Sequence, residues 1–126
     1  MIRLISVVLV SVVSLSFGEY KKSRLYDYQT GSNLSTTQTG NHSRTYDYGT
    51  GNSYSSRKTG NSVSTYDYGS GTYSTTRKTG SGTTTYDYET GSYSNTRKSG
   101  NDYYNNSGNS NSRKRAVTGS LLLDEE

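Results

Sequence analysis

The chain has 126 residues, a formal net charge of +4 at pH 7, fourteen tyrosines, fourteen glycines and no cysteine, proline or tryptophan. The absence of cysteine excludes a small secreted domain held together by disulfides. Only 27% of the residues are hydrophobic, which excludes a conventional aliphatic core, so we expect tyrosine to supply most of any core.

The first eighteen residues differ in composition from the rest of the chain. Arg3 precedes an apolar stretch over residues 4–17, and small residues surround a cleavage site after Gly18. The stretch is shorter than the ~20 apolar residues of a membrane-spanning helix. We predict a signal peptide over 1–18, cleavage between Gly18 and Glu19, and a short leader over 19–23. The mature protein is then expected to be secreted, or to lie at the cell surface or in the periplasm, without an integral membrane segment.

A unit of twenty residues follows the leader. Its marker is the triplet tyrosine-aspartate-tyrosine, which occurs at Tyr26-Asp27-Tyr28, Tyr46-Asp47-Tyr48, Tyr66-Asp67-Tyr68 and Tyr86-Asp87-Tyr88. Self-similarity at a fixed period indicates a repeat architecture, in which function usually belongs to a surface. We predict a tandem repeat region over 24–100 and a polar tail or cap over 101–126.

Glycines preceded by threonine or serine punctuate the repeats at spacings that alternate between nine and eleven. They are Gly31, Gly40, Gly51, Gly60, Gly71, Gly80, Gly91 and Gly100. Glycine supplies the positive φ of tight hairpin turns, and the tyrosine- and threonine-rich segments between the glycines are typical of strands. The pattern predicts an all-β fold of twenty-residue β-hairpin repeats joined by two-residue turns.

Two-residue turns at the dipeptides predict the register. They place Tyr68 opposite Tyr73, Tyr73 opposite Tyr86, and Tyr88 opposite Tyr93. Because side chains alternate between the faces of a sheet, the tyrosines of the triplets share one face and the aspartates lie on the other. The predicted binding or assembly surface, called the tyrosine face below, consists of Tyr26, Tyr28, Tyr46, Tyr48, Tyr66, Tyr68, Tyr73, Tyr86, Tyr88 and Tyr93.

Two arrangements of these strands are open: an antiparallel meander of hairpins and a β-solenoid. A solenoid stacks the four aspartates in a column at ~4.8 Å, where neighbouring like charges repel, so we favour the meander. Burial of tyrosine alone does not offset the entropy of ordering the chain. Either a dense backbone hydrogen-bond ladder and subunit assembly supply the remaining stability, or the isolated monomer stays largely disordered.

The segment Tyr46-Asp47-Tyr48-Gly49-Thr50-Gly51-Asn52-Ser53 contains a G-x-G-N sequence. It resembles the core of the curlin repeat, the strand-turn-strand unit of bacterial curli amyloid subunits, although Gln29, Gly69 and Glu89 occupy the position of Gly49 in the other repeats. The resemblance implies an exported protein that forms adhesive biofilm fibres. A weaker similarity, through Thr84-Thr85-Tyr86-Asp87-Tyr88, is to YD-repeat proteins.

Catalytic chemistry is poorly supported by the sequence. His42 is the sole histidine and does not recur in the other repeats, and the carboxylates are spread at about one per repeat. A nucleophile needs a nearby base and a metal needs clustered ligands. We expect no enzymatic activity, no metal site and no cofactor.

Basic pairs recur as regularly as the tyrosines, at Arg57-Lys58, Arg77-Lys78 and Arg97-Lys98. They either keep the sheet soluble or form a basic stripe for an anionic polysaccharide, lipid head group or nucleic acid. Because four aspartates interleave with the pairs and the chain is predicted to be exported, no nucleic acid is expected as a partner.

The tail contains Arg113-Lys114-Arg115 and, further on, Leu121, Leu122 and Leu123. It is either disordered or forms a terminal strand or cap whose leucines cover the end of the repeats. We predict a structural or adhesive protein of the surface or extracellular matrix, whose partner is a second copy of itself or a surface polysaccharide. The alternatives are a carbohydrate-binding module and a secreted peptide precursor that is cleaved at the dibasic sites.

Overall fold

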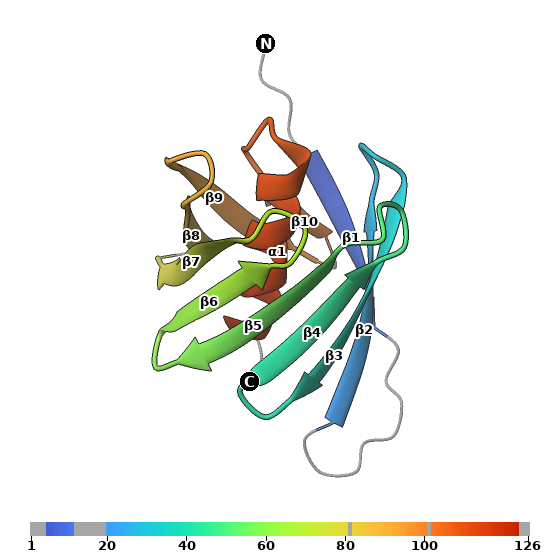
Figure 1. The fold of residues 1–126 in the computed structure, drawn as a ribbon, viewed down its shortest axis with the longest axis horizontal. Helices are drawn as coiled ribbons and strands as arrows, with labels where there is room; N and C mark the ends of the chain where they lie inside the picture. The colour runs from blue at the N-terminus through green and yellow to red at the C-terminus, as the bar shows by residue number, and fades with distance from the viewer. Residues whose placement is uncertain (1–4, 12–19, 81, 101, 124–126) are drawn as a thin grey trace.

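The computed structural model describes residues 5–11, 20–80, 82–100 and 102–123. These residues form ten strands and one helix (Figure 1). The elements are β1 (Ile5–Ser11), β2 (Tyr20–Asp27), β3 (Ser32–Thr39), β4 (His42–Asp47), β5 (Ser53–Thr59), β6 (Ser62–Asp67), β7 (Thr72–Thr79), β8 (Gly82–Asp87), β9 (Ser92–Ser99), β10 (Asp102–Asn105) and α1 (Ser110–Leu123).

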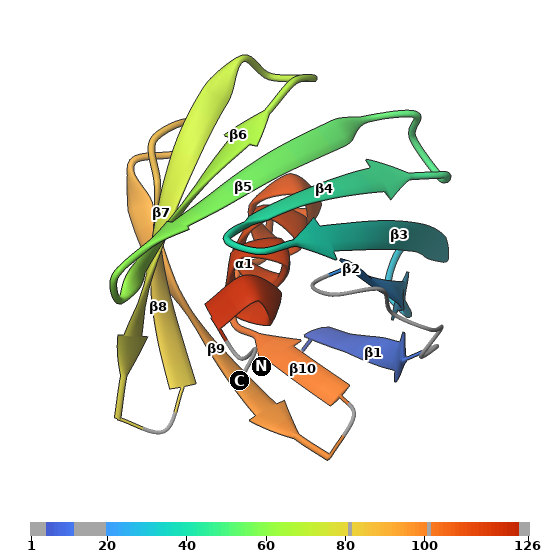
Figure 2. The same ribbon diagram turned by 90° about the horizontal axis from the view of Figure 1, so that it is seen from below.

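The strands form an antiparallel meander that closes into a barrel. Each strand from β2 to β10 pairs with its neighbours in sequence, and β1 lies between β10 and β2. Seen from below, the strands surround α1 (Figure 2). The prediction of an all-β fold built from hairpin repeats is confirmed, and the strands run as a meander.

The strand that closes the barrel belongs to the segment predicted as a signal peptide. In β1, Val8 is aligned with Asp102 of β10 on one side and with Tyr26 of β2 on the other. The predicted cleavage residues Gly18 and Glu19 lie outside the described residues, so export stays a prediction. Removal of residues 1–18 would leave β2 and β10 as the two edges of a nine-stranded sheet.

Two kinds of turn alternate along the meander. Between β5 and β6, Thr59 pairs with Ser62 across a two-residue turn, in which Gly60 has φ of 62°. Between β6 and β7, Asp67 pairs with Thr72 across a four-residue loop, which the bond from the Gly71 amide to the Asp67 carbonyl (2.8 Å) closes. All eight glycines predicted in turns have positive φ, between 47° and 81°. The alternation of a two-residue turn with a four-residue loop explains the spacings of nine and eleven.

The four-residue loop changes the predicted register. Tyr66, rather than Tyr68, is opposite Tyr73, and Tyr86, rather than Tyr88, is opposite Tyr93. The cause is the aspartate, whose side chain accepts hydrogen bonds from backbone amides inside the loop and starts the turn two residues earlier than the Ser-Gly dipeptide does. Across the two-residue turn, Thr75 rather than Tyr73 is opposite Tyr86, because Thr79 pairs with Gly82 and is not part of the turn. A shift of two residues leaves every side chain on its predicted face.

The tyrosine face is the outer face of the barrel, so the prediction of a mainly tyrosine core is wrong. The inner face consists largely of serine and threonine together with the four aspartates of the triplets, all nearly inaccessible. Two small apolar clusters lie inside. One contains Leu25, Leu34, Tyr54, Tyr103 and Val117, and the other contains Val63, Leu122 and Leu123. Hydrogen bonds and ion pairs therefore replace much of the usual apolar packing.

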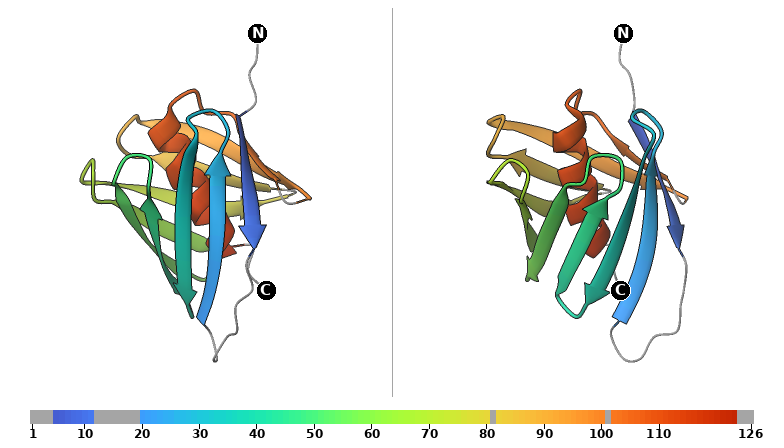
Figure 3. Two further views of the ribbon diagram at one scale, coloured as in Figure 1. Left: turned by 90° about the vertical axis from the view of Figure 1, so that its right-hand side faces the viewer. Right: turned by 45° about the vertical axis from the view of Figure 1, so that its right-hand side comes forward.

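The predicted tail contains both a strand and a helix, because Asp102–Asn105 form β10 and residues 110–123 form α1 inside the barrel. The two views in Figure 3 show strands on both sides of the helix. Every residue from Ser112 to Ser120 is buried. Small residues allow this close fit: a Cβ atom on Gly119 would lie 2.5 Å from the Thr76 hydroxyl. Leu122 and Leu123 do cover apolar surface, against Val63 on the inner wall.

We predict that Gly119→Ala lowers the free energy of unfolding by about 1–3 kcal/mol, since an added methyl group has no space beside Thr76. Alanine is intrinsically the better helix residue by about 1 kcal/mol, so the sign of the change separates packing from helix propensity. Urea unfolding followed by circular dichroism measures it. Gly108→Ala, where a Cβ atom meets nothing within 4 Å, is the matched control and should change little. A stabilised Gly119→Ala variant would contradict the close packing.

Candidate functional site: the tyrosine face and the ion pairs beneath it

The aspartate of each triplet is the last residue of its strand, and its carboxylate is bound from two sides. Its Oδ1 atom accepts a hydrogen bond from the backbone amide two residues later, at distances of 2.9–3.0 Å. The donors are the amides of Gln29, Gly49, Gly69 and Glu89. The Oδ2 atom of each points into the barrel toward α1. One carboxylate thus closes its own turn and also offers a negative charge to the interior.

Three consecutive residues of α1 supply the opposite charges. Arg113 donates to Asp27 through Nε (3.1 Å) and Nη2 (2.7 Å), and Lys114 donates to Asp47 (2.7 Å). Arg115 bridges two strands. It binds Asp67 through Nη1 and Asp87 through Nε (3.1 Å) and Nη2 (2.8 Å), and it also contacts Glu89. The helix is therefore bonded to β2, β4, β6 and β8.

The central position of α1 lets adjacent residues reach different walls. Successive residues of an α-helix project about 100° apart, so a run of three cations on a surface helix cannot face a single partner. Inside a barrel each direction meets a strand. Arg113 points to β2, Lys114 to β4, and Arg115 to β6 and β8.

These contacts shift the protonation equilibria of the buried groups. Burial by itself raises the pKa of Asp47, Asp67 and Asp87, but the hydrogen bonds that they accept and the charge of Lys114 or Arg115 outweigh burial. The pKa of each carboxyl therefore lies below its ordinary value. Burial likewise lowers the pKa of Arg115, and its bonds to Asp87 and Asp67 raise it further than burial lowers it. All four groups thus stay charged at neutral pH.

The fifth hairpin replaces the aspartate by Asn105. Its Oδ1 atom accepts from the Ser107 amide (2.8 Å), as an aspartate does in the other repeats, and its Nδ2 donates to Thr96 (2.8 Å) and Ser94 (3.2 Å). With no cation of α1 left for this position, a neutral amide avoids an unpaired buried charge.

The ion pairs of the interior are absent from the sequence prediction. The register analysis places the aspartates on one face, but it does not show that this face is the inner one. The available signal is the run Arg113-Lys114-Arg115, a compact set of cations near a repeated row of four carboxylates. It was interpreted as a possible protease site, because charges so far apart in sequence give no local sign of pairing.

The tyrosine face lies on the outside as four pairs of rings, each formed by the two tyrosines of one triplet. The ring centroids are 4.8–5.0 Å apart and nearly perpendicular. Tyr73 and Tyr93 add a third ring to two of the pairs, at 4.9 and 4.8 Å. Seven of the ten predicted residues are well exposed, from 42% for Tyr46 to 72% for Tyr93, and Tyr26, Tyr66 and Tyr86 are half-buried between their neighbours. Mutual ring contacts therefore hold the exposed rings in place.

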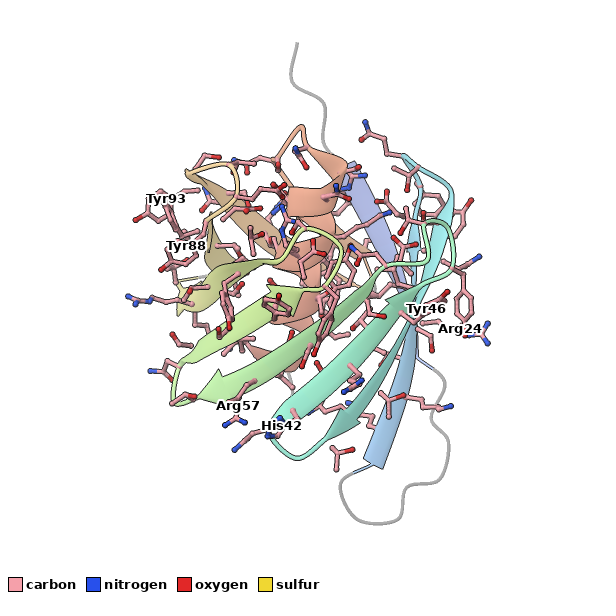
Figure 4. The ribbon with its side chains drawn as sticks, in the orientation of Figure 1. Arg24, His42, Tyr46, Arg57, Tyr88 and Tyr93 are labelled. Carbon is pink, nitrogen blue, oxygen red and sulfur yellow. The ribbon has the colours of Figure 1, made fainter. Side chains whose placement is uncertain are left out.

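Aromatic and basic residues occupy different ends of the outer wall. The tyrosines lie near the four-residue loops, which form the aromatic rim of the barrel. The recurring Arg-Lys pairs lie near the two-residue turns at the other end, which form the basic rim. Figure 4 shows this separation: Tyr88 and Tyr93 project together at one side, whereas Arg57 lies beside His42 at the lower edge. The separation is not complete: Arg24 and Tyr46, on β2 and β4, lie together, and Arg77 lines one groove with Tyr86, Tyr88 and Tyr93.

The outer wall is more basic than the net charge indicates. Between Tyr20 and Asn105, six lysines and arginines lie on the outer face and are exposed: Lys22, Arg24, Arg44, Arg57, Arg77 and Arg97. Four more, Lys21, Lys58, Lys78 and Lys98, are exposed or half-exposed at inner-face positions of the basic rim. The acidic residues that reach the surface of this stretch are Glu89 and Asp102. The four aspartates that alternate with the basic pairs in sequence are inside, where α1 neutralises them. They do not neutralise the outer surface.

No cluster of three or more metal-ligating side chains is formed by the described part of the chain. His42 is exposed at the start of β4. Within the same ranges no helix is long and apolar enough to cross a membrane. The candidate functional site is therefore the tyrosine face and the basic residues next to it.

The fold and the site define a ten-stranded antiparallel barrel, filled by its own C-terminal helix and covered outside by tyrosine and arginine. No protein-family model, curated protein or solved structure matches the chain. The similarity to curlin-type and YD-repeat proteins consequently stays a prediction.

We predict that Arg115→Met lowers the free energy of unfolding by about 3–5 kcal/mol, because methionine fills the space but leaves Asp67 and Asp87 without their cation. Equilibrium urea unfolding measures the change. Arg57→Met, at an exposed position, is the control and should alter stability by no more than about 0.5 kcal/mol. Equal effects of the two substitutions would show that the internal ion pairs do not stabilise the barrel.

Stability should also fall in acid. The pKa values of Asp47, Asp67 and Asp87 are lower in the folded chain than in the unfolded chain, where an aspartate titrates near 3.9. Their stabilising effect is complete above the unfolded value and is lost as pH falls through the folded values. Urea midpoints should be nearly constant from about pH 7 to 5 and decrease below about pH 4. The double variant Asp47→Asn/Lys114→Met lacks one of these ion pairs, so its urea midpoint should decrease less on acidification. A midpoint that rises in acid would contradict the pairing.

Proposed function

We propose that this protein is an exported adhesive component of a cell surface or extracellular matrix, and that its tyrosine face binds surface polysaccharide. The observation that supports this most directly is the exposure of seven tyrosines on one outer face, between 42% and 72%. Soluble proteins rarely expose so much aromatic surface without a partner. Rings held by neighbouring rings lose little entropy on binding and can stack on the flat faces of sugars.

The chemistry around the rings favours a sugar over an apolar partner. In residues 21–80, 82–100 and 102–123, the exposed large hydrophobic residues are all tyrosines, and serine, threonine and asparagine lie between them. Hydroxyl and amide groups next to an aromatic ring are the groups that hydrogen-bond the rim of a sugar while the ring packs on its face. The repetition of this composition suits a repetitive polymer.

Self-assembly through strand edges depends on whether β1 is retained. Fibres of the curli type grow by pairing unpaired strand edges, and in the full chain β1 pairs with both β2 and β10. Assembly by this route would require loss of β1, which the predicted cleavage of residues 1–18 would cause. The polysaccharide proposal does not depend on that event.

A peptide precursor is less favoured. A processing protease needs an extended and accessible site, whereas Arg113, Lys114 and Arg115 are helical, at most 3% exposed, and bound to aspartates. The remaining basic pairs lie within hydrogen-bonded strands.

Substitution of the second tyrosine of three triplets tests the proposal. We expect Tyr48→Ser/Tyr68→Ser/Tyr88→Ser to reduce binding to a responsive polysaccharide, found in a panel of neutral and acidic polymers, by about tenfold or more. The matched variant with phenylalanine at the same positions keeps the rings and should retain most of the binding. Circular dichroism verifies that both variants keep the sheet. Failure of the native protein to bind any polymer of the panel would reject the proposed function.

A further inference from the structure

We infer that the outer wall binds an acidic polysaccharide, and that one groove on it accepts a uronic acid residue, with Arg77 binding the carboxylate and the adjacent tyrosines packing on the ring. The groove has a volume of about 380 Å³ and lies on strands β7, β8 and β9. Its lining includes Thr75, Arg77, Thr84, Tyr86, Tyr88 and Tyr93. The inference rests on the proposed function and specifies the class of polysaccharide.

The segregation of charge provides the first argument. Six basic side chains lie on the outer face between Tyr20 and Asn105, four more lysines lie at the basic rim, and the exposed acidic residues of this stretch are Glu89 and Asp102, so the surface has a positive potential. The internal aspartates, at most 3% exposed, cannot screen it. A neutral polysaccharide would make no use of these charges, whereas a polymer with one carboxylate per sugar or per disaccharide would meet several of them.

The composition of the groove provides the second argument. Arg77 is exposed and forms no hydrogen bond or ion pair with the described residues, so its guanidinium group is available for a ligand. It is aligned with Thr84 on the neighbouring strand, and Thr75 is aligned with Tyr86. Guanidinium groups bind carboxylates with two parallel hydrogen bonds. The groove thus combines a carboxylate receptor, hydroxyl groups for a sugar's own hydroxyls, and three tyrosine rings.

The sequence repeats this set of residues on the preceding hairpin. Arg57, Ser64, Tyr66, Tyr68 and Tyr73 occupy the positions that correspond to Arg77, Thr84, Tyr86, Tyr88 and Tyr93. Arg57 is aligned with Ser64, as Arg77 is with Thr84. Equivalent residues two strands apart are separated by about 10 Å, which is the scale of a disaccharide. Two equivalent positions at this spacing fit a polymer with a regular repeat of carboxylates.

Other anionic partners fit the surface less well. Duplex DNA is recognised mostly by an element that enters a groove, and the convex barrel wall has no projecting helix or long ribbon among the described residues. A lipid surface is held by aliphatic or tryptophan side chains as well as by charge, and in residues 21–80, 82–100 and 102–123 the exposed large hydrophobic residues are all tyrosines. The acidic polysaccharide is the partner that uses both the cations and the rings.

The test measures the affinity of the full chain for polygalacturonate, neutral dextran, duplex DNA and phosphatidylglycerol vesicles by calorimetry. We expect binding to polygalacturonate that weakens at least tenfold when the salt concentration rises from about 0.05 to 0.5 M. Arg57→Gln/Arg77→Gln should weaken it at least tenfold more than Lys58→Gln/Lys78→Gln does. The lysine variant is a matched control, because it removes the same charge from the adjacent residues of the same strands.

Each alternative result overturns the inference in a distinguishable way. Binding to dextran with equal affinity and no salt dependence would leave the proposed function intact but reject the acidic ligand. Tighter binding to DNA or to the vesicles than to polygalacturonate would assign the surface to that partner instead. Equal losses in the arginine and lysine variants would reject the groove in favour of general attraction. Absence of binding to every polysaccharide would reject the proposed function as well. The salt dependence of the native protein decides the ligand class even if a variant fails to fold.

Discussion

The fold depends on the bonds between three cations of one helix and four carboxylates of the surrounding barrel. Residues Arg113, Lys114 and Arg115 reach β2, β4, β6 and β8, so one turn of α1 is fixed to strands spread around the wall. Such buried charges are costly to desolvate, and they are tolerated because nearly every oxygen also accepts a backbone or side-chain hydrogen bond. Small hydroxyl side chains on much of the inner face leave room for the helix, and two small apolar clusters fill the rest.

The triplet tyrosine-aspartate-tyrosine connects this interior to the surface. Since side chains alternate along a strand, the aspartate that binds α1 places a tyrosine outward on each side of it. The Asp67 carboxylate, for example, binds Arg115 and accepts a hydrogen bond from the Gly69 amide of the loop. On the opposite face, Tyr66 and Tyr68 form a ring pair. A rigid inner network thus supports the rings outside, and one short motif serves both stability and the proposed binding.

The sequence contained enough information for the repeat, the hairpin meander and the face of each tyrosine. The predicted register is wrong by two residues, but each side chain stays on its predicted face, because side chains along a strand alternate with a period of two residues. Which face is the inner one could not be deduced, since tyrosine is the more apolar choice and the partners of Asp27 and Asp87 are 86 and 28 residues away. The helix was missed for a related reason: residues 110–123 are buried all round, so they show no amphipathic pattern of the kind that identifies a helix on a surface.

The position of α1 at the end of the chain affects how the protein can form. A chain that emerges from its amino terminus, whether from a ribosome or through an export channel, presents all the hairpins before the residues that neutralise their carboxylates. The native contacts span 86, 67, 48 and 28 residues, and such long-range contacts delay folding. Before residues 110–123 are present, closure of the wall would bury four carboxylates without their cations, which is costly. The ion pairs therefore couple closure of the barrel to the arrival of the helix.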